Sequence, residues 1–428
     1  AMYGYGKFLI TDQGYGSVLT GDIRREMMSS RNHSMVVMNN KNLSAALLDG
    51  ASLGSEINNF YDYTSYSTPL NVDATTQERS VLFDRDRKLF VVSDYIKPKS
   101  STASNSYVQY WNMMPDANMS IDENTKTVRS NFEDVNVSIT PVGSDQFVRA
   151  QLEDNMFSGG AGSFQPAKKS AFEKVTKGDV TFDAVIVPEN IGEKFSVETF
   201  AVPTGMPQGA ANAFYFDLHN EKTGEVSRAY YSHLNDLSQR SELTVGNYKT
   251  DATTMYVAEA PDGTLESVFL MNATYLKDSS LTDKYVFKSV QEIPSISFKR
   301  NGNTTEILSS VLNSSDMEKI TFYDYDVIKN VTINGDVPNT IKTFGGYLYF
   351  GNYPIIDGSE RSESFSNLVL TGPKPSDGGI SSGTNRPAGT NNLGISNVFY
   401  ARTYAEIKND SLGGKLANDK YLCLSRNS

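Results

Sequence analysis

The stretch VLFDRDRKLFVVSDYI (residues 81–96) decides the fold class of this 428-residue chain. Two short apolar runs, VLF and LFVV, flank a charged turn segment, and neither is long enough for an amphipathic helix. Comparable runs recur roughly every ten residues between clusters of turn-forming residues. Examples are VNVSITPV (135–142), VTFDAVIVP (180–188) and FYFDLHN (214–220). The sequence therefore predicts an all-β protein.

Composition excludes several classes of protein. No apolar run approaches the length of about 18 residues that a membrane-spanning helix requires. The net charge of −11 argues against general nucleic-acid binding. The single cysteine, Cys423, rules out an intrachain disulfide. The chain contains no phosphate-binding loop, dinucleotide-binding glycine motif, zinc-finger spacing or serine-hydrolase elbow.

The distribution of strand-like segments predicts two domains. Residues 1–280 are expected to form a large β-domain that closes with a hairpin over residues 248–277. Residues 281–428 are expected to form a smaller C-terminal β-domain, because their strand signals are weaker. This part also contains a long loop rich in glycine, serine and asparagine, LTGPKPSDGGISSGTNRPAGTNNLG (370–394).

Two long loops are predicted within the first domain, at about residues 49–80 and 153–178. The first contains four aromatic residues within NNFYDYTSYSTPLN, namely Phe60, Tyr61, Tyr63 and Tyr66. Aromatic rings in binding loops often stack on the faces of sugar rings. The alternative is that these rings pack on the edge of the β-domain. The single tryptophan, Trp111, lies within a strand-like segment and is expected in the core.

The N-terminal segments YGYGKFLITDQGYGS (3–17) and RNHSMVV (31–37) place polar residues at two strand ends. Asp12 follows the apolar run 8–10, and His33 precedes the apolar run 35–38. These side chains are therefore able to face a common point. The structural alternatives are an Asx-turn at Asp12 and a strand-end histidine at His33 that is bonded to backbone. The other two histidines, His219 and His233, are expected to be structural.

A cationic segment lies between these two strand ends. DIRREMMSSRNH (22–33) contains Arg24, Arg25 and Arg31 against two acidic residues. A local cationic surface can attract an anionic substrate even when the whole protein is acidic. The alternative is a solvated strand edge whose charges prevent edge-to-edge association.

The order and spacing of several motifs resemble the C-terminal β-sandwich of the heparinase II/III-type polysaccharide lyases. The first two are FLITDQGYGS followed by RNHSMVV, and RSVLFDRDRKLFVVSDYI. The next is SYVQYWNMMPD, which has Asn112 where a histidine is common in the family. The last is the hairpin TTMYVAEAPDGTLESVFLMNATYL. The resemblance covers about residues 1–277 and implies a large antiparallel β-sandwich.

The resemblance also implies an activity and its parts. Members of the family cleave uronic-acid polysaccharides by β-elimination, and an N-terminal (α/α) toroid supplies much of the chemistry. The chain would thus be the β half of such an enzyme, inactive without a toroid domain or partner chain. By resemblance, Asp12 and His33 hold a divalent metal with a third ligand from a preceding strand. Zinc is the expected metal, with manganese or calcium as alternatives.

Further roles follow from the same resemblance. Tyr15 is the candidate catalytic acid, with the loop tyrosines as rivals. The candidates for substrate binding are Arg24, Arg25, Arg31, Tyr61 and Tyr63. The low content of basic residues favours alginate over a sulfated glycosaminoglycan, and bacterial relatives are secreted or periplasmic. The alternatives are a non-catalytic carbohydrate-binding or cell-surface sandwich and, for residues 281–428, a purely structural module.

Overall fold

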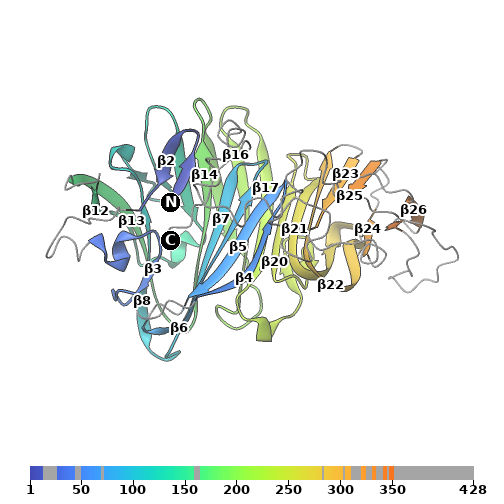
Figure 1. Ribbon diagram of the computed structural model, residues 1–428, viewed down its shortest axis with the longest axis horizontal. Coiled ribbons are helices and arrows are strands. Elements are labelled where there is room, and N and C mark those ends of the chain that lie inside the picture. Colours follow the sequence, from blue (N-terminus) through green and yellow to red (C-terminus); the bar gives the residue numbers. More distant parts are fainter. Residues whose placement is uncertain are drawn as a thin grey trace, which may run out of the picture.

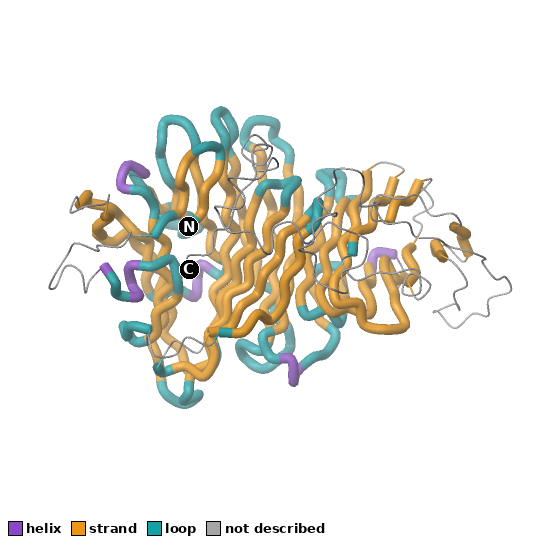
Figure 2. The backbone as a smooth tube through the Cα atoms, viewed as in Figure 1, coloured by secondary structure: helices purple, strands orange, loops and turns teal. Residues whose placement is uncertain are grey.

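Strands dominate the computed structural model of this protein (Figure 1; Figure 2). It describes residues 1–12, 27–43, 50–68, 72–158, 164–281, 284–301 and 304–309, together with the short strands 320–323, 330–333, 341–344 and 347–350. The described strands form antiparallel sheets almost throughout, and a single parallel pairing joins β23 to β25 among them. The prediction of an all-β sandwich is thus confirmed.

The central sheet has eight strands that combine distant parts of the chain. In spatial order they are β4 (Ala51–Ile57), β5 (Tyr61–Thr68), β6 (Ala74–Asp84), β7 (Leu89–Pro98), β14 (Val180–Glu189), β11 (Asn136–Pro141), β10 (Val128–Arg129) and β9 (Ser120–Ile121). The hairpin of β6 and β7 is the strand pair that the stretch 81–96 predicts.

A second sheet, here named the small sheet, lies against one face of the central sheet (Figure 1). Its four strands are β12 (Arg149–Ser158), β13 (Phe164–Lys177), β8 (Ser104–Asn112) and β3 (Val36–Met38). The N-terminal hairpin of β1 (Met2–Gly4) and β2 (Lys7–Ile10) packs into the same layer boundary, because Leu9 and Ile10 are buried there.

A third sheet, here named the large sheet, covers the other face of the central sheet and contains 13 strands. Its main path is β15 (Phe195–Ala201), β16 (Ala211–Asn220), β17 (Val226–Leu234), β20 (Thr254–Glu259), β21 (Leu265–Asp278), β22 (Lys284–Asn301), β24 (Ile320–Tyr323), β27 (Tyr347–Phe350) and β26 (Ile341–Phe344). Off this path lie β18 (Leu243–Val245), β19 (Tyr248–Thr250), β23 (Thr304–Leu308) and β25 (Asn330–Ile333). The hairpin predicted over 248–277 is confirmed by the pairing of β20 with β21.

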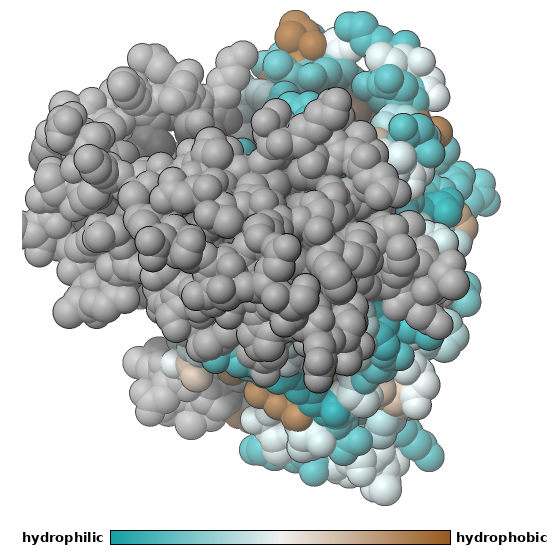
Figure 3. Space-filling view, turned by 90° about the vertical axis from the view of Figure 1, so that its right-hand side faces the viewer, coloured by the Kyte–Doolittle hydropathy of each residue, from teal (hydrophilic) through white to brown (hydrophobic). Residues whose placement is uncertain are grey.

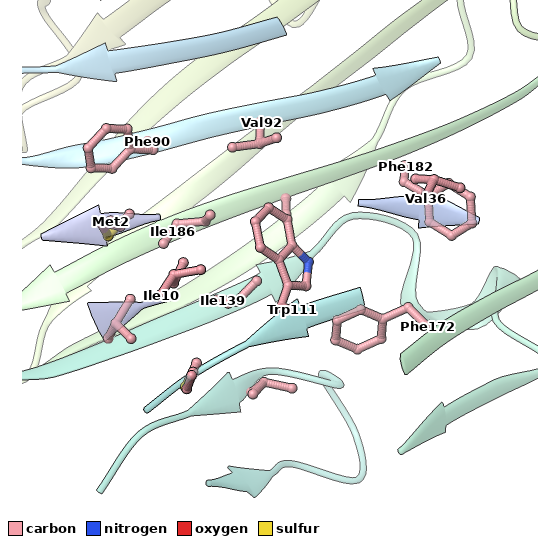
Figure 4. Close-up of a cluster of buried hydrophobic side chains, with 14 of the residues drawn as sticks. Met2, Ile10, Val36, Phe90, Val92, Trp111, Ile139, Phe172, Phe182 and Ile186 are labelled. Carbon is pink, nitrogen blue, oxygen red and sulfur yellow. The ribbon is translucent and has the colours of Figure 1, made fainter. Parts of the chain in front are cut away.

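The central sheet is buried on both faces, and this explains its continuous apolar runs. On β7, Val92 belongs to the core shared with the small sheet, whereas Val91 belongs to the core shared with the large sheet. Figure 4 shows the first of these cores, in which Trp111 from β8 lies among side chains that include Ile139 and Ile186. The prediction of a core tryptophan is confirmed.

Both predicted long loops are wrong, because both regions are mostly strand. Residues 51–57, 61–68 and 74–84 form β4, β5 and β6, and residues 149–158 and 164–177 form the hairpin of β12 and β13. The sequence of β5 is polar to the eye, but Tyr61, Tyr63 and Ser65 alternate inward with a period of two. Serine and tyrosine hydroxyls that find partners across the sheet interface permit this burial.

The predicted boundary near residue 280 lies inside a continuous sheet. β22 pairs with β21 over most of its length, and β23 and β24 pair with β22. Residues 351–428, which include the predicted glycine-rich loop, lie outside the described residues. The division into two domains stays a prediction.

The end of the molecule away from the small sheet is seen in Figure 3. The described residues visible on that face are mostly hydrophilic, and the hydrophobic ones stand in separate small groups. In the part of the chain that the structure describes, we find no helix with the length and hydropathy needed to span a bilayer.

Candidate functional site

Asp12 and His33 lie in direct contact at the end of the small sheet. His33 Nδ1 is 2.6 Å from Asp12 Oδ2, and the two side chains are 38% and 37% exposed. Asp12 follows β2, whose continuation donates the Thr11 N–H to the carbonyl of Asn112 at 3.0 Å. His33 follows the 3-10 turn Ser30–Asn32. The structure therefore brings together the two residues that the sequence places at neighbouring strand ends.

Two side chains of the small sheet hold the turn that carries His33. Lys169, only 3% exposed, donates from Nζ to the carbonyl of Arg31 at 2.8 Å and to Asn32 Oδ1 at 3.0 Å. Asn112, which is fully buried, donates from Nδ2 to the carbonyl of Asn32 at 3.1 Å. Because Asn112 also accepts from Thr11, it fixes both halves of the Asp12–His33 pair relative to one another.

This arrangement determines which chemistry the pair can perform. A carboxylate that holds the Nδ1–H of an imidazole fixes its tautomer and leaves Nε2 as the basic nitrogen. That nitrogen can accept a proton or bind a metal. Carboxylate and imidazole are donors that suit zinc. The described residues contain no group of three or more metal-binding side chains, so a metal site requires a further ligand from elsewhere. Metal binding stays a prediction.

The remaining predicted site residues have different outcomes. Tyr15, Arg24 and Arg25 lie outside the described residues. Arg31 lies beside the pair and lines a groove on the small sheet. The prediction that Tyr61 and Tyr63 contact substrate is wrong, because both are buried between the central and large sheets, at 1% and 4% exposure.

The hydroxyls of the two buried tyrosines explain why they are not available. Tyr61 Oη donates to Ser267 Oγ at 2.6 Å, and Tyr63 Oη lies 3.0 Å from Thr254 Oγ1. Burial raises the pKa of Tyr63 to about 12. Both rings pack against Phe269 of the large sheet. They therefore join two layers rather than line a surface.

The histidine on β17 is structural, as the sequence predicts. His233 is buried, its Nδ1 lies 2.9 Å from Thr254 Oγ1, and burial lowers its pKa to about 4. His219 is half-buried on β16, in the large sheet, away from the Asp12–His33 pair.

A groove of about 450 Å³ runs over the outer face of the small sheet. Charged and aromatic side chains line it, among them Arg31, Tyr110, Arg149, Glu153, Lys169 and Glu173. Among them only Arg31 is predicted from the sequence. Glu153, Lys169 and Glu173 lie in the region 153–178, which the sequence predicts to be a loop, and the roles of Tyr110 and Arg149 depend on how their strands pair. The signal was present, since the residues at 149 and 153 on one strand and at 169 and 173 on the next stand at even spacings, which place them on one face.

The charged side chains in this groove form ion pairs with one another. Arg149 donates from Nε to Glu173 Oε2 at 2.7 Å and also pairs with Glu153. The hydrogen bond from Ser106, together with Arg149, lowers the pKa of Glu173 below its ordinary value. The Lys169 ammonium lies 4.7 Å from the centre of the Tyr110 ring. The groove is thus lined by fixed donors and acceptors at half-buried positions.

Comparisons with known proteins found similarity to solved structures only. Neither a protein-family model nor a curated protein matches the chain. The chain is similar to the heparan sulfate lyase HepC from Pedobacter heparinus, with 19% identity and a TM-score of 0.43 over 52% of this chain and 34% of that one. It is also similar to a heparinase III, the BT4657 gene product, with 18% identity and a TM-score of 0.44 over 54% of this chain and 35% of that one.

The chain therefore spans about a third of the length of the solved structures that it matches. Those structures belong to the kind of lyase that the motifs in the sequence resemble. Both similarities cover about half of this chain.

Proposed function

We propose that this chain is the β-sandwich part of a polysaccharide lyase that cleaves a uronic-acid polymer by β-elimination. The observation that carries the proposal is the contact between Asp12 and His33 at a half-exposed strand end. The order of the motifs over residues 1–277 supports it. The activity, substrate and partners of the whole protein are part of the proposal.

The chemistry divides into two tasks. A base removes the proton α to the uronate carboxylate, the electron pair forms the double bond, and the glycosidic oxygen leaves with a proton from an acid. The developing negative charge on the carboxylate must be stabilised by hydrogen-bond donors, arginine or a metal. We assign Tyr15 to the acid, and Arg24, Arg25 and Arg31 to the substrate carboxylates.

Asp12 and His33 are the residues that would hold a divalent metal, zinc by their donor chemistry, together with a ligand from another segment or chain. A bound metal would brace the floor of the site and polarise the substrate. In the geometry of the structure Asp12 accepts the Nδ1–H and orients His33 for a metal at Nε2, and direct ligation by both side chains would require this hydrogen bond to open. An (α/α) toroid would supply the rest of the site, and alginate is the preferred substrate. We also propose a secreted or periplasmic location, because the bacterial lyases that the motifs resemble are secreted or periplasmic.

The test is an elimination assay on the natural protein with alginate, unsulfated glycosaminoglycan and a neutral glycan. Ultraviolet absorbance of the unsaturated uronate reports the reaction. We expect activity on uronate polymers alone, and loss of at least two orders of magnitude in kcat for His33→Gln. Asp86→Asn is the matched control, because Asp86 forms a surface ion pair with Lys299 at 2.6 Å, away from the site.

Two results would contradict the proposal. One is cleavage that yields saturated products, since hydrolysis leaves no double bond. The other is full activity of His33→Gln with normal folding. Binding of glycans without any cleavage by the natural protein would favour the alternative, a non-catalytic carbohydrate-binding module.

A further inference from the structure

The groove on the small sheet is built by side chains that stand in register across its strands. Arg149 on β12 is opposite Glu173 on β13, Glu173 is opposite Val108 on β8, and Val108 is opposite Val37 on β3. Residues directly opposite one another in antiparallel strands point to the same face. This row therefore joins a charged rim on β12 and β13 to an apolar strip on β8 and β3.

The next row lies beneath the groove. Ala171 on β13 is opposite Tyr110 on β8, and the two form one apolar cluster with Val37 and Val108. The four side chains are buried, at 0% to 7% exposure, so the cluster supports the groove from below. Glu153 and Lys169 form the row beyond it, and Lys169 is opposite Asn112. The groove thus presents mainly polar and charged groups above a buried apolar base.

The groove adjoins the Asp12–His33 pair. Arg31 lines the groove and is two residues from His33, and Lys169 and Asn112 hold the turn between them. A polymer that reaches the pair could therefore continue along the outer face of the small sheet. The cationic end of the groove, at Arg31 and Lys169, is the end next to the pair.

The charge balance of the lining determines the class of ligand. Three cationic residues are matched by three acidic ones, which are Glu153, Asp154 and Glu173. Arg149 already has two carboxylate partners, so a sulfate group would have to displace them and approach both. Fixed carboxylates accept hydrogen bonds from hydroxyls and repel densely charged anions. Paired donors and acceptors at fixed positions suit the hydroxyls of a sugar.

We infer that this groove is a binding site for unsulfated saccharide. Sugar hydroxyls bind at Arg149, Glu153 and Glu173, and a uronate carboxylate, where one is present, lies at the Arg31 end. The inference rests on the proposed function for the polysaccharide class, and it adds a second contact region that excludes sulfated chains.

The test is calorimetric binding of the protein to an unsulfated oligouronate and to a heparan sulfate oligosaccharide of equal length. We expect binding of the first and at least tenfold weaker binding of the second. Arg149→Met should weaken the first by about tenfold or more, through loss of charge-assisted hydrogen bonds. Arg228→Met is the matched control, because Arg228 pairs with Asp217 at 2.6 Å and 2.7 Å on the large sheet.

Hydrogen exchange locates the site independently of any variant. The bound oligouronate should protect amides of β12 and β13, and Glu153→Gln gives a second variant that keeps the size of the side chain. Equal losses for Arg149→Met and Arg228→Met, or protection confined to other strands, would overturn the inference. Tighter binding of the sulfated ligand would also overturn it.

The outcomes separate this inference from the proposed function. If Arg149→Met weakens oligouronate binding but the natural protein cleaves no polymer, the groove inference stands and the proposed lyase function fails. If the protein cleaves the polymer and Arg149→Met leaves KM unchanged, the lyase function stands and the groove inference fails.

Discussion

The ionic cluster around Asp84 and Arg87 can be compared with the Asp12–His33 pair at the end of the small sheet. The Asp84 and Arg87 side chains are 1% and 9% exposed, whereas those of Asp12 and His33 are 37% and 38% exposed. Asp84 accepts from Tyr256 Oη at 2.9 Å and from the N–H groups of Asp86 and Arg87 at 3.0 Å. The Asp84 carboxylate therefore accepts its hydrogen bonds from groups within the protein.

Arg87 is equally occupied, since it donates to the carbonyl of Glu259 at 3.0 Å and pairs with Glu266. This cluster joins the turn between β6 and β7 to β20 and β21 of the large sheet. The Asp12–His33 pair keeps more than a third of each side chain open to solvent. Burial and complete pairing make the Asp84–Arg87 cluster structural, whereas the exposed Asp12–His33 pair is accessible to a ligand.

The largest expected effect is on the buried cluster. Asp84→Ala leaves the Arg87 guanidinium buried without its carboxylate, and should lower the free energy of unfolding by about 3–5 kcal/mol. Urea denaturation measures it. Lys299→Met, which removes an exposed ion pair, should cost about 0–1 kcal/mol. Equal effects of the two substitutions would contradict the conclusion that the buried cluster contributes more to stability than an exposed ion pair.

Two further buried groups, Asp183 and His233, should contribute opposite pH dependences of stability. Burial is the main cause that raises the pKa of Asp183 to about 6 from 3.8 and that lowers the pKa of His233 to about 4 from 6.5. The contribution of Asp183 is fully present below pH 3.8 and is lost as the pH rises through about 6. That of His233 is fully present above pH 6.5 and is lost as the pH falls through about 4.

These opposite slopes nearly cancel. From pH 7 to pH 4, the stability of Asp183→Asn should fall relative to the wild type by about 2 kcal/mol, because the contribution of the aspartate is absent. Over the same interval, the stability of His233→Gln should rise relative to the wild type by about 3 kcal/mol, because the contribution of the histidine is absent. Urea denaturation at both pH values measures the slopes. Parallel curves for both variants and the wild type would contradict this prediction.

A smaller effect is expected at Lys169, which belongs to the scaffold of the candidate site. Lys169→Met leaves the carbonyl of Arg31 and the amide oxygen of Asn32 without this donor, at a cost of about 1–3 kcal/mol in the free energy of unfolding. Hydrogen exchange should show faster opening of residues 30–33 than in the wild type. Stability loss without a local change in exchange would show that Lys169 does not position His33.

The smallest effect on stability is expected at the exposed pair itself. His33→Gln should change the free energy of unfolding by about 1 kcal/mol or less, because half-exposed ion pairs contribute little. The same substitution should abolish any binding of zinc ions measured by calorimetry on the natural protein. A loss of stability as large as that of Asp84→Ala would place this pair in the structural class.

The sequence predicts the fold well where apolar residues mark the pattern. The runs 81–83 and 89–92 form β6 and β7, and the turn PDG separates β20 from β21. It fails at β5 and at β12 with β13, where the buried positions carry tyrosine, serine, alanine or lysine. These residues are polar or small, and their burial depends on partners supplied by strands far away in the chain.

The sequence predicts the candidate site only in part. The strand ends at Asp12 and His33 are visible in the sequence, and the structure brings them together. Lys169, Arg149 and Asn112 are not visible, because their roles depend on the register of β12, β13 and β8. The tyrosines of β5 mislead, since a ring that could stack on a sugar can equally join two sheets.

The place of β14 in the central sheet has a consequence for biosynthesis. β7 is hydrogen-bonded to β14, yet all strands from β8 to β13 are made between them. As the polypeptide leaves the ribosome, the apolar strand β7 therefore waits without this neighbour until residues 99–179, which separate the two strands, have been made. Slow, long-range strand pairing of this kind favours aggregation. We expect nascent chains of this protein to depend on chaperones until that strand is available.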